Sequence, residues 1–267
     1  MGCIADVPAP VDNAIEFRYV FRVSTPLIAA HRGSNEFLPE QTIAAFRQAL
    51  EEDADGLEFD VRLTADRQLV LHHDRNVRRT SDGRGAIADL TLDELKKFDF
   101  SVNRDNVPDD PEARELATLE ELFKLVSDSG KDVKLYAELK HPSRFGGELE
   151  TRFFEFLRDW PELDVVVMSF SKAALKRWHE LDPERGLVWI FEFPYGKIPP
   201  GVEMLSSKVD YIESAADFAA TTKDDGYGLL SWTVNDPDQA RRLADQGVDV
   251  LFSDRPGEIK KALALKG

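Results

Sequence analysis

The sequence predicts a single-domain α/β fold, a (β/α)8 TIM barrel, from two observations. Short apolar runs rich in β-branched residues alternate with helical segments along most of the chain. These runs show little apolar–polar alternation, which is typical of parallel strands covered on both faces. Roughly eight strands with intervening helices fit a barrel of this size. A doubly wound open sheet is the alternative, but no glycine-rich dinucleotide-binding turn follows the first strand.

Strands are expected where apolar residues run almost without interruption for about four to eight positions. The first such run ends at His31, and several of the others also end beside charged or polar residues. In chain order the expected strands span residues 26–31, 56–63, 68–72, 133–139, 165–170, 186–191, 209–213, 228–234 and 248–252.

The segments between the strands predict helices. Two of them begin with a capping box, in which a threonine precedes a glutamate by three residues: Thr91 with Glu94, and Thr118 with Glu121. A short loop insertion is expected around residues 99–117, where Asp, Asn and Pro are frequent. In chain order the expected helices span residues 41–52, 91–98, 118–127, 148–160, 171–181 and 237–246.

Composition excludes several classes of protein. The net charge of −16 argues against binding to nucleic acid or stable association with anionic membranes. Cys3 is the only cysteine, which excludes an intramolecular disulfide and a cysteine-based metal site. The sequence contains no apolar run long enough for a membrane span and no recognisable secretory signal. We therefore expect a cytoplasmic monomer or small homo-oligomer, with an N-terminal extension at residues 1–24 and one barrel domain at residues 25–267.

Three carboxylates lie on two of the expected strands. Glu58 and Asp60 are two residues apart, so their side chains point to the same face, and in a barrel that face is the interior near the mouth. Two carboxylates held together in a dry cleft repel each other unless a cation lies between them. Glu138, late on another strand, offers a third oxygen ligand. Such a set suits one divalent cation, Mg²⁺ or Ca²⁺, with Mn²⁺ as a further option.

Two basic residues and two histidines complete the candidate chemistry. Lys140 lies on the same strand face as Glu138, and Arg32 follows the first strand, so both can hold phosphate oxygens. His31 and His73 end strands on either side of the paired carboxylates, and histidine exchanges protons near neutral pH. Alternation sends His72 to the opposite face, where we expect a packing or surface role.

Several motifs in the same order resemble the glycerophosphodiester phosphodiesterase family. They are AHRG (30–33), PEQT (39–42), LEFDVRLT (57–64), the pair His73-Asp74, AELK (137–140), SWTVN (231–235) and SDRP (253–256). The resemblance covers residues 27–257. It implies a (β/α)8 barrel that hydrolyses glycerophosphodiesters, small-molecule substrates, to an alcohol and glycerol 3-phosphate with a divalent cation.

The same resemblance implies a role for each candidate residue. The metal ligands would be Glu58, Asp60 and Glu138, the general acid and base would be His31 and His73, and the phosphate-binding residues would be Arg32 and Lys140. Glu40 would help to organise the site, and Trp232 would line the substrate pocket. The residues leave open which histidine is the acid and which is the base.

Other functions on the same residues remain open. A lysophospholipase D-like or sphingomyelinase D-like enzyme would have an exposed apolar loop near the site. A sugar-phosphodiester hydrolase would use the same phosphate machinery. A non-catalytic phosphate-binding module would be expected to lack at least one histidine or carboxylate, and this sequence retains them all.

Overall fold

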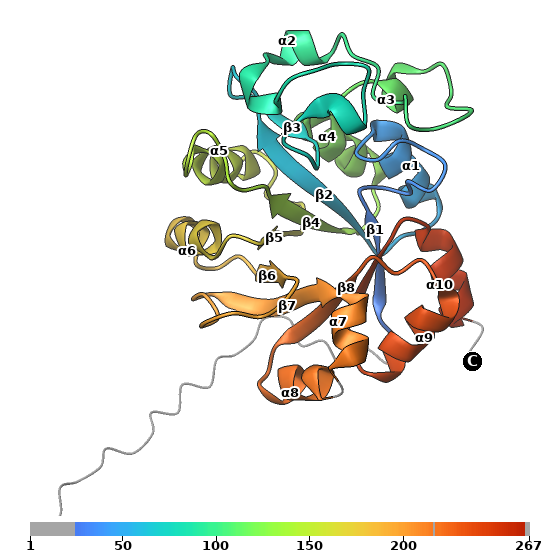
Figure 1. Cartoon of the computed structure of the whole chain (residues 1–267), viewed down its shortest axis with the longest axis vertical. Helices are drawn as coiled ribbons and strands as arrows, with labels where there is room; N and C mark the ends of the chain where they lie inside the picture. Colours follow the sequence, from blue (N-terminus) through green and yellow to red (C-terminus); the bar gives the residue numbers. More distant parts are fainter. Residues whose placement is uncertain (1–24, 216, 265–267) are drawn as a thin grey trace, which may run out of the picture.

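The computed structural model describes residues 25–215 and 217–264, and the expected extension at residues 1–24 lies outside this range. Within the described residues, eight parallel strands close into a barrel surrounded by helices (Figure 1). The hydrogen-bonded order is β1-β9-β8-β7-β6-β5-β4-β2, and a pairing of β1 with β2 closes the ring. The predicted TIM barrel is therefore confirmed. Its strands are β1 (Leu27–His31), β2 (Gly56–Leu63), β4 (Lys134–Leu139), β5 (Val165–Ser169), β6 (Leu187–Phe191), β7 (Val202–Lys208), β8 (Gly228–Trp232) and β9 (Val250–Ser253).

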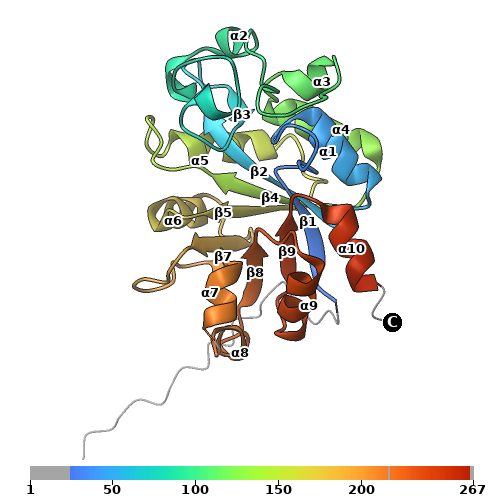
Figure 2. The same cartoon turned by 45° about the vertical axis from the view of Figure 1, so that its right-hand side comes forward.

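The helices lie on the outside of the barrel, and a second view shows α9 and α10 beside β1, β8 and β9 (Figure 2). Both predicted capping boxes are present, at Thr91 before α2 and at Thr118 before α4, which explains where these helices begin. The helices are α1 (Ile43–Glu51), α2 (Leu92–Leu95), α3 (Pro111–Arg114), α4 (Leu119–Ser129), α5 (Glu148–Leu157), α6 (Lys172–Leu181), α7 (Val209–Ser214), α8 (Phe218–Asp224), α9 (Pro237–Asp245) and α10 (Pro256–Ala264).

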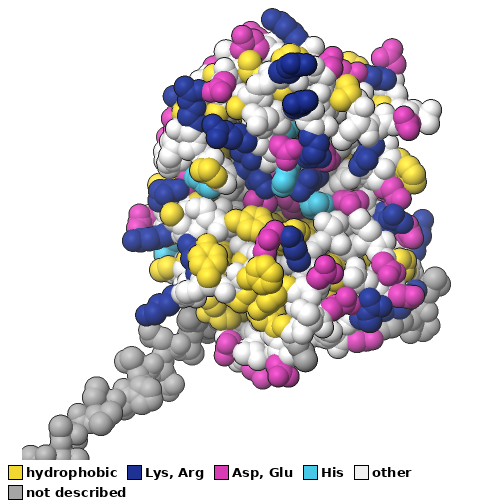
Figure 3. Space-filling model, in the orientation of Figure 1, with side chains coloured by type: hydrophobic (Ala, Val, Ile, Leu, Met, Phe, Trp, Pro, Cys, Tyr) yellow, Lys and Arg dark blue, Asp and Glu magenta, His cyan; other side chains and the backbone are white. Residues whose placement is uncertain are grey.

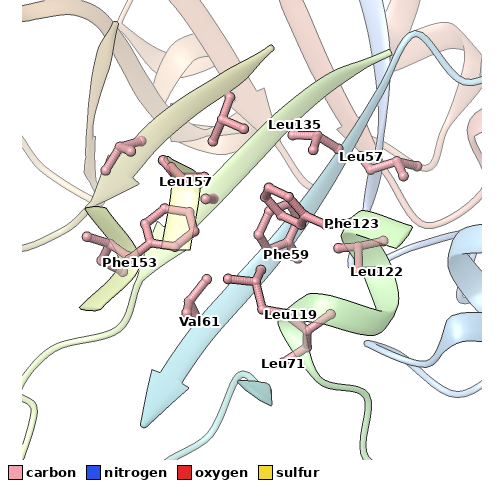
Figure 4. Packing of buried hydrophobic residues seen from close by; sticks show 14 of the residues in the cluster. Leu57, Phe59, Val61, Leu71, Leu119, Leu122, Phe123, Leu135, Phe153 and Leu157 are labelled. Atoms are coloured by element: carbon pink, nitrogen blue, oxygen red, sulfur yellow. The ribbon is translucent and has the colours of Figure 1, made fainter. Parts of the chain in front are cut away.

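Strand β2 separates an apolar face from a charged one. Leu57, Phe59 and Val61 belong to the large hydrophobic core between the barrel wall and its helices. Phe59 packs edge-to-face on Phe123 of α4, with ring centroids 6.1 Å apart (Figure 4). Full burial of a phenylalanine side chain contributes about 1.5–3 kcal/mol. Because alternate residues face opposite ways, this packing directs the acidic residues of β2 into the barrel.

A separate cluster fills the interior of the barrel. Tyr136 of β4 packs edge-to-face on Phe252 of β9 across the interior, with ring centroids 5.2 Å apart. The neighbours of these rings come from β5, β6, β7 and β8. The interior is thus packed solid below the charged residues, as in other barrels of this class. The polar site is therefore confined to the carboxyl end of the strands.

Two strand predictions differ from the structure. The segment 68–72 contains a strand, β3 (Leu69–Leu71), but it pairs antiparallel with β2 and does not belong to the barrel wall. The predicted strand at 209–213 is wrong, because these residues form α7. Val209 and Ile212 are both buried, and their spacing of three residues puts them on one helix face. The wall strand is instead β7, which was not predicted because its buried Ser206 and Ser207 interrupt the apolar pattern.

The expected loop insertion around residues 99–117 is not a loop throughout. It contains the short helix α3, with Asp110 as N-cap and Pro111 at the first helical position. The Arg114 guanidinium ties the segment together by donating to the carboxylate of Asp99 at 2.8 Å and to the carbonyl of Val107 at 3.1 Å. Helices α8 and α10 were not predicted either.

Candidate active site

The three predicted acidic residues converge at the mouth of the barrel. Each of Glu58, Asp60 and Glu138 offers one carboxylate oxygen, and these oxygens all lie within 4.8 Å of one another. The convergence follows from strand register, since Asp60 of β2 is paired with Glu138 of β4. All three side chains are buried. The arrangement matches the hard oxygen ligands that Mg²⁺ and Ca²⁺ prefer.

The electrostatics of the cluster are those of a cation site. Burial, with the negative charge of Asp60 added, raises the pKa of Glu58 well above its ordinary value. Burial also raises the pKa of Glu138 to about 7, again with Asp60 contributing. Asp60 Oδ1 is buried and accepts no well-aligned hydrogen bond, although Lys140 Nζ lies 3.1 Å away. The residues present therefore fit a divalent cation, which would relieve the repulsion between them.

Two cations flank the carboxylates. Lys140 Nζ lies 2.8 Å from Glu138 and 3.1 Å from Asp60, and Arg32 Nε lies 3.3 Å from the other oxygen of Asp60. Although burial opposes its charge, Lys140 and then Arg32 hold the pKa of Asp60 well below its ordinary range. Both cations therefore favour the ionised form of Asp60.

A sharp turn after β1 directs Arg32 toward the site. Arg32 has a positive φ of 58°, and Gly33 follows with φ 86°. A Cβ at Gly33 would lie 2.7 Å from the side chain of Ala45, so only glycine fits this turn against α1. The amide of Arg32 donates to the side chain of Glu58 at 2.9 Å. A left-handed conformation at a non-glycine residue costs of order 1 kcal/mol and is typical of functional sites.

The loop before α1 contributes two supporting residues. Glu40 accepts a hydrogen bond from Arg32 at 3.0 Å and two from Arg79 at 2.7 Å each. Gln41, buried and with φ 64°, donates from Nε2 to Asp60 Oδ2 at 2.7 Å. The sequence analysis gave no role to Gln41 or Arg79. Gln41 lies inside the PEQT motif, whereas nothing in the local sequence points to Arg79.

Each predicted histidine is oriented by an aspartate. His31 Nδ1 lies 2.7 Å from Asp254 Oδ1, and His73 Nδ1 lies 2.7 Å from Asp74 Oδ1. An ionised carboxylate only accepts hydrogen bonds, so Nδ1 carries the proton and Nε2 is the nitrogen whose lone pair remains available. Burial lowers the pKa of His73, although the charge of Asp60 opposes the shift. Both rings are therefore held ready for proton transfer.

Asp254 had no assigned role in the sequence analysis, although it belongs to the SDRP motif. Its carboxylate also accepts hydrogen bonds from Asn35 at 2.9 Å and from Asn235 at 2.6 Å. Although burial opposes its charge, the bond from His31 lowers the pKa of Asp254 to about 2. Its position just after β9, at the same end of the barrel, is the signal that could have identified it.

His72 points away from the site, as expected from strand alternation. It is buried and hydrogen-bonds through Nε2 to Thr80 Oγ1 at 2.9 Å and through Nδ1 to the carbonyl of Asp74 at 2.8 Å. Burial lowers the pKa of His72 to about 4, so the ring is neutral at physiological pH.

A cavity of about 290 Å³ opens at the mouth of the barrel and brings most of the predicted residues together, although Glu40, Asp60 and Lys140 do not line it. His31, Arg32, Glu58, His73 and Glu138 line one side of it. The opposite wall, called the apolar wall below, is formed mainly by Met168, Phe170, Ile190, Trp232 and Phe252, and it also contains the ion pair of Glu192 with Lys208. Figure 3 shows histidine side chains near the centre of this face, with many basic side chains above them and a group of hydrophobic ones below.

Trp232 lies where the sequence analysis expected it, at the end of β8 on the cavity wall. Its ring packs edge-to-face on Phe170, with centroids 5.8 Å apart, and Lys208 Nζ lies 5.5 Å from its centroid. A larger groove, of about 530 Å³, lies between α1 and α4 and contains none of the predicted residues. Size alone therefore does not distinguish the candidate active site, and the side-chain chemistry of the smaller cavity is what makes it the candidate.

The sequence matches the model of the glycerophosphoryl diester phosphodiesterase family over residues 31–258. The chain belongs to this family. It is 31% identical over 236 residues to a glycerophosphodiester phosphodiesterase of Caldanaerobacter subterraneus, covering 86% of this chain and 94% of that protein. It is 29% identical over 254 residues to a glycerophosphodiester phosphodiesterase of Bacillus subtilis, covering 88% of this chain and 85% of that protein. Family membership places the protein among the phosphoric diester hydrolases.

Solved structures of the family are similar to this one. An Oleispira antarctica phosphodiesterase in complex with the product sn-glycerol-3-phosphate has a TM-score of 0.79 and 28% identity, covering 90% of this chain and 97% of that chain. A glycerophosphodiester phosphodiesterase from Parabacteroides distasonis has a TM-score of 0.76 and 27% identity, covering 91% of this chain and 98% of that chain. Across residues 25–215 and 217–264, no helix has the length and apolar character needed to cross a membrane.

Proposed function

We propose that this glycerophosphodiester phosphodiesterase family member hydrolyses glycerophosphodiesters to glycerol 3-phosphate and an alcohol, with one divalent cation. One observation carries the proposal: two histidines, each held by a carboxylate, line the same cavity as a cluster of buried carboxylates. Proton transfer and charge neutralisation are the two requirements of phosphodiester cleavage near neutral pH.

The cation would be held by Glu58, Asp60 and Glu138, and Mg²⁺, Ca²⁺ and Mn²⁺ all suit these oxygen donors. When bound, it supplies Lewis-acid polarisation of the phosphoryl group. Arg32 and Lys140 bind the phosphate oxygens and neutralise charge that builds up on them. Arg32 is suited to this because Glu40 and Asp60 already hold its guanidinium, so little ordering remains when substrate binds.

His31 and His73 act as the general base and general acid. One Nε2 removes a proton from the nucleophile as its oxygen bonds to phosphorus. The other Nε2 gives a proton to the alcohol oxygen as its bond to phosphorus breaks. The nucleophile is either the glycerol 2-hydroxyl, which gives a cyclic phosphate that water then opens, or water itself. Bis(p-nitrophenyl) phosphate has no neighbouring hydroxyl, so its cleavage requires direct attack by water.

The test is metal-dependent release of glycerol 3-phosphate. Protein stripped with EDTA would be assayed on glycerophosphocholine and glycerophosphoethanolamine after Mg²⁺, Ca²⁺ or Mn²⁺ is restored. Asp60→Asn should abolish the metal-dependent rate. Asp249→Asn is the matched control, because Asp249, just before β9, is also buried but pairs with Lys223 at 2.5 Å. An inactive wild-type protein with every metal would reject the function, and a rate that survives metal removal would reject the cation.

A second substrate class, lysophospholipids, has one observation in its favour. Phe193 and Tyr195, in the loop after β6, are 71% and 59% exposed, and Ile190 of the same strand lines the cavity. An acyl chain attached to the glycerol would extend from the apolar wall of the cavity over the exposed rings of this loop. Phe193→Ser should then slow hydrolysis of lysophosphatidylcholine more than hydrolysis of glycerophosphocholine. Equal effects on the two substrates would count against the lysophospholipid.

A further inference from the structure

A basic groove adjoins the active site on the side opposite the apolar wall. It has a volume of about 660 Å³ and shares His73 with the active-site cavity. Its lining includes Arg62, Arg75, Arg78 and Arg79. This concentration of arginines stands out on a chain whose net charge is −16. A local excess of positive charge on an acidic protein indicates a site for an anion.

The partners of these arginines show which charges remain available. Arg79 is held by Glu40 and Asp74, so its charge is balanced. Arg62 donates to the carbonyls of His72 and His73, which fixes its position without neutralising it.

Arg75 and Arg78 are both exposed. Among the described residues, neither forms an ion pair or a side-chain hydrogen bond. The one carboxylate that lines the groove, Asp74, already accepts from His73 and from Arg79. The positive charge of Arg75 and Arg78 is therefore not balanced within the groove.

The geometry of a phosphodiester connects this groove to the reaction, and the argument rests on the proposed function. A diester whose phosphorus lies among Arg32, Lys140 and the histidines extends one arm over the apolar wall and the other past His73. The glycerol arm is common to all substrates and uncharged, and its carbon atoms suit the face of Trp232. The alcohol arm then enters the basic groove.

We propose that the groove at Arg75 and Arg78 is a subsite for an alcohol arm that carries a second anionic group, a phosphate monoester or a carboxylate. A cationic arm such as choline would be repelled there. The preferred substrates are therefore glycerophosphodiesters of anionic alcohols. Guanidinium groups bind phosphate oxygens through charge-assisted hydrogen bonds, which are stronger than neutral ones.

The test compares two substrates that differ by one phosphate group. Release of glycerol 3-phosphate would be measured from glycerophosphoinositol and from glycerophosphoinositol 4-phosphate, with glycerophosphocholine alongside. For the wild type, the ratio of kcat/KM for glycerophosphoinositol 4-phosphate to kcat/KM for glycerophosphoinositol should be roughly ten, given two exposed charge pairs of ordinary strength. The double variant Arg75→Ala/Arg78→Ala should lower this ratio toward one. Arg158→Ala, which removes an exposed arginine just after α5, should keep it.

Ionic strength gives a second measurement that needs no variant. The wild-type ratio should decline between 0.05 and 0.5 M NaCl, because exposed charges are screened over about 10 Å at 0.1 M and over shorter distances at higher salt. If glycerophosphocholine is cleaved but the 4-phosphate gains nothing over glycerophosphoinositol, the subsite is rejected and the proposed function stands. If none of the three diesters releases glycerol 3-phosphate, both are rejected.

Discussion

Asp74→Asn tests how the structure controls the proton on His73. Asp74 Oδ1 accepts from His73 Nδ1 at 2.7 Å, and Oδ2 accepts from Arg79 Nε at 2.6 Å. Arg79 only donates, and it is anchored by two further bonds to Glu40. An asparagine must therefore turn its oxygen to Arg79 and its NH₂ group to His73. Nδ1 then has to accept, which moves the ring proton to Nε2, so the neutral ring no longer has a lone pair on Nε2 with which to take up a proton.

The magnitude follows from the bonds that are lost. Although burial opposes its charge, hydrogen bonds from Arg79 and His73 lower the pKa of Asp74 to about 2, so it is ionised at neutral pH. A hydrogen bond to a charged group contributes about 1.5–3 kcal/mol, or roughly 10- to 150-fold in rate. The side chains of His73 and Asp74 are about one third exposed, so solvent screening reduces the contribution of their hydrogen bond. The wrong tautomer adds to the loss, since acid–base catalysis contributes ~10²–10⁴-fold in total. We expect kcat/KM to fall by about 10²–10³-fold.

The assay is release of glycerol 3-phosphate as a function of pH, with circular dichroism to verify folding. Loss of the carboxylate should also lower the pKa of His73, which moves the limb of the pH profile governed by this residue to lower pH. Asp89→Asn is the matched control, because Asp89 forms an ion pair with Arg144 and has no histidine partner. A folded Asp74→Asn protein with kcat/KM within threefold of wild type would refute the reasoning.

Three further predictions concern stability and the supporting residues. Gln41→Leu should weaken the metal affinity, measured by titrating the rate against metal concentration, by about 10–100-fold, because the substitution removes the hydrogen bond to Asp60. Gln41→Asn should retain most of the affinity. Equal titration curves for Gln41→Leu and the wild type would contradict this prediction. Metal added to stripped protein should raise its melting temperature by a few degrees, and Glu58→Gln should lose the rise; an equal rise in the variant would place the cation elsewhere. The pKa of His72 is about 4 when folded and about 6.5 when unfolded, so only the unfolded chain takes up a proton between these values. Stability should therefore fall by up to about 3 kcal/mol as pH drops through that window, and urea denaturation of His72→Gln at pH 7 and 4.5 should show a smaller fall than wild type. Equal falls would show that His72 is not the group responsible.

The sequence by itself determined which residues of β2 face the active site. The two-residue period of a strand required Glu58 and Asp60 to share a face, and the apolar Leu57, Phe59 and Val61 required that face to be the interior. The same argument separated His73 from His72. Such predictions depend only on local geometry and on the exclusion of apolar side chains from water, and both can be read from a short window of residues.

Errors occurred where local pattern does not determine structure. Val209 and Ile212 suggested a strand, but apolar residues three apart also fit one face of a helix. Residues 69–71 form a strand as predicted, yet nothing local reveals that it turns back antiparallel on β2. The barrel strand β7 was not predicted because two serines interrupt its apolar pattern, although the closed barrel buries both of them completely. Short segments carry too little information to distinguish these outcomes.

The partners that orient the proposed catalytic groups were decided only by the tertiary structure. Asp254 lies 223 positions from His31 in the chain, and Arg79 lies 39 positions from Glu40. Closure of the ring between β1 and β9 makes the first contact, and the loop after β3 makes the second. The sequence determined the inventory of acids, bases and cations at the strand ends. The fold decided which of them meet, because hydrogen bonds act over about 3 Å and only chain closure brings distant residues that close.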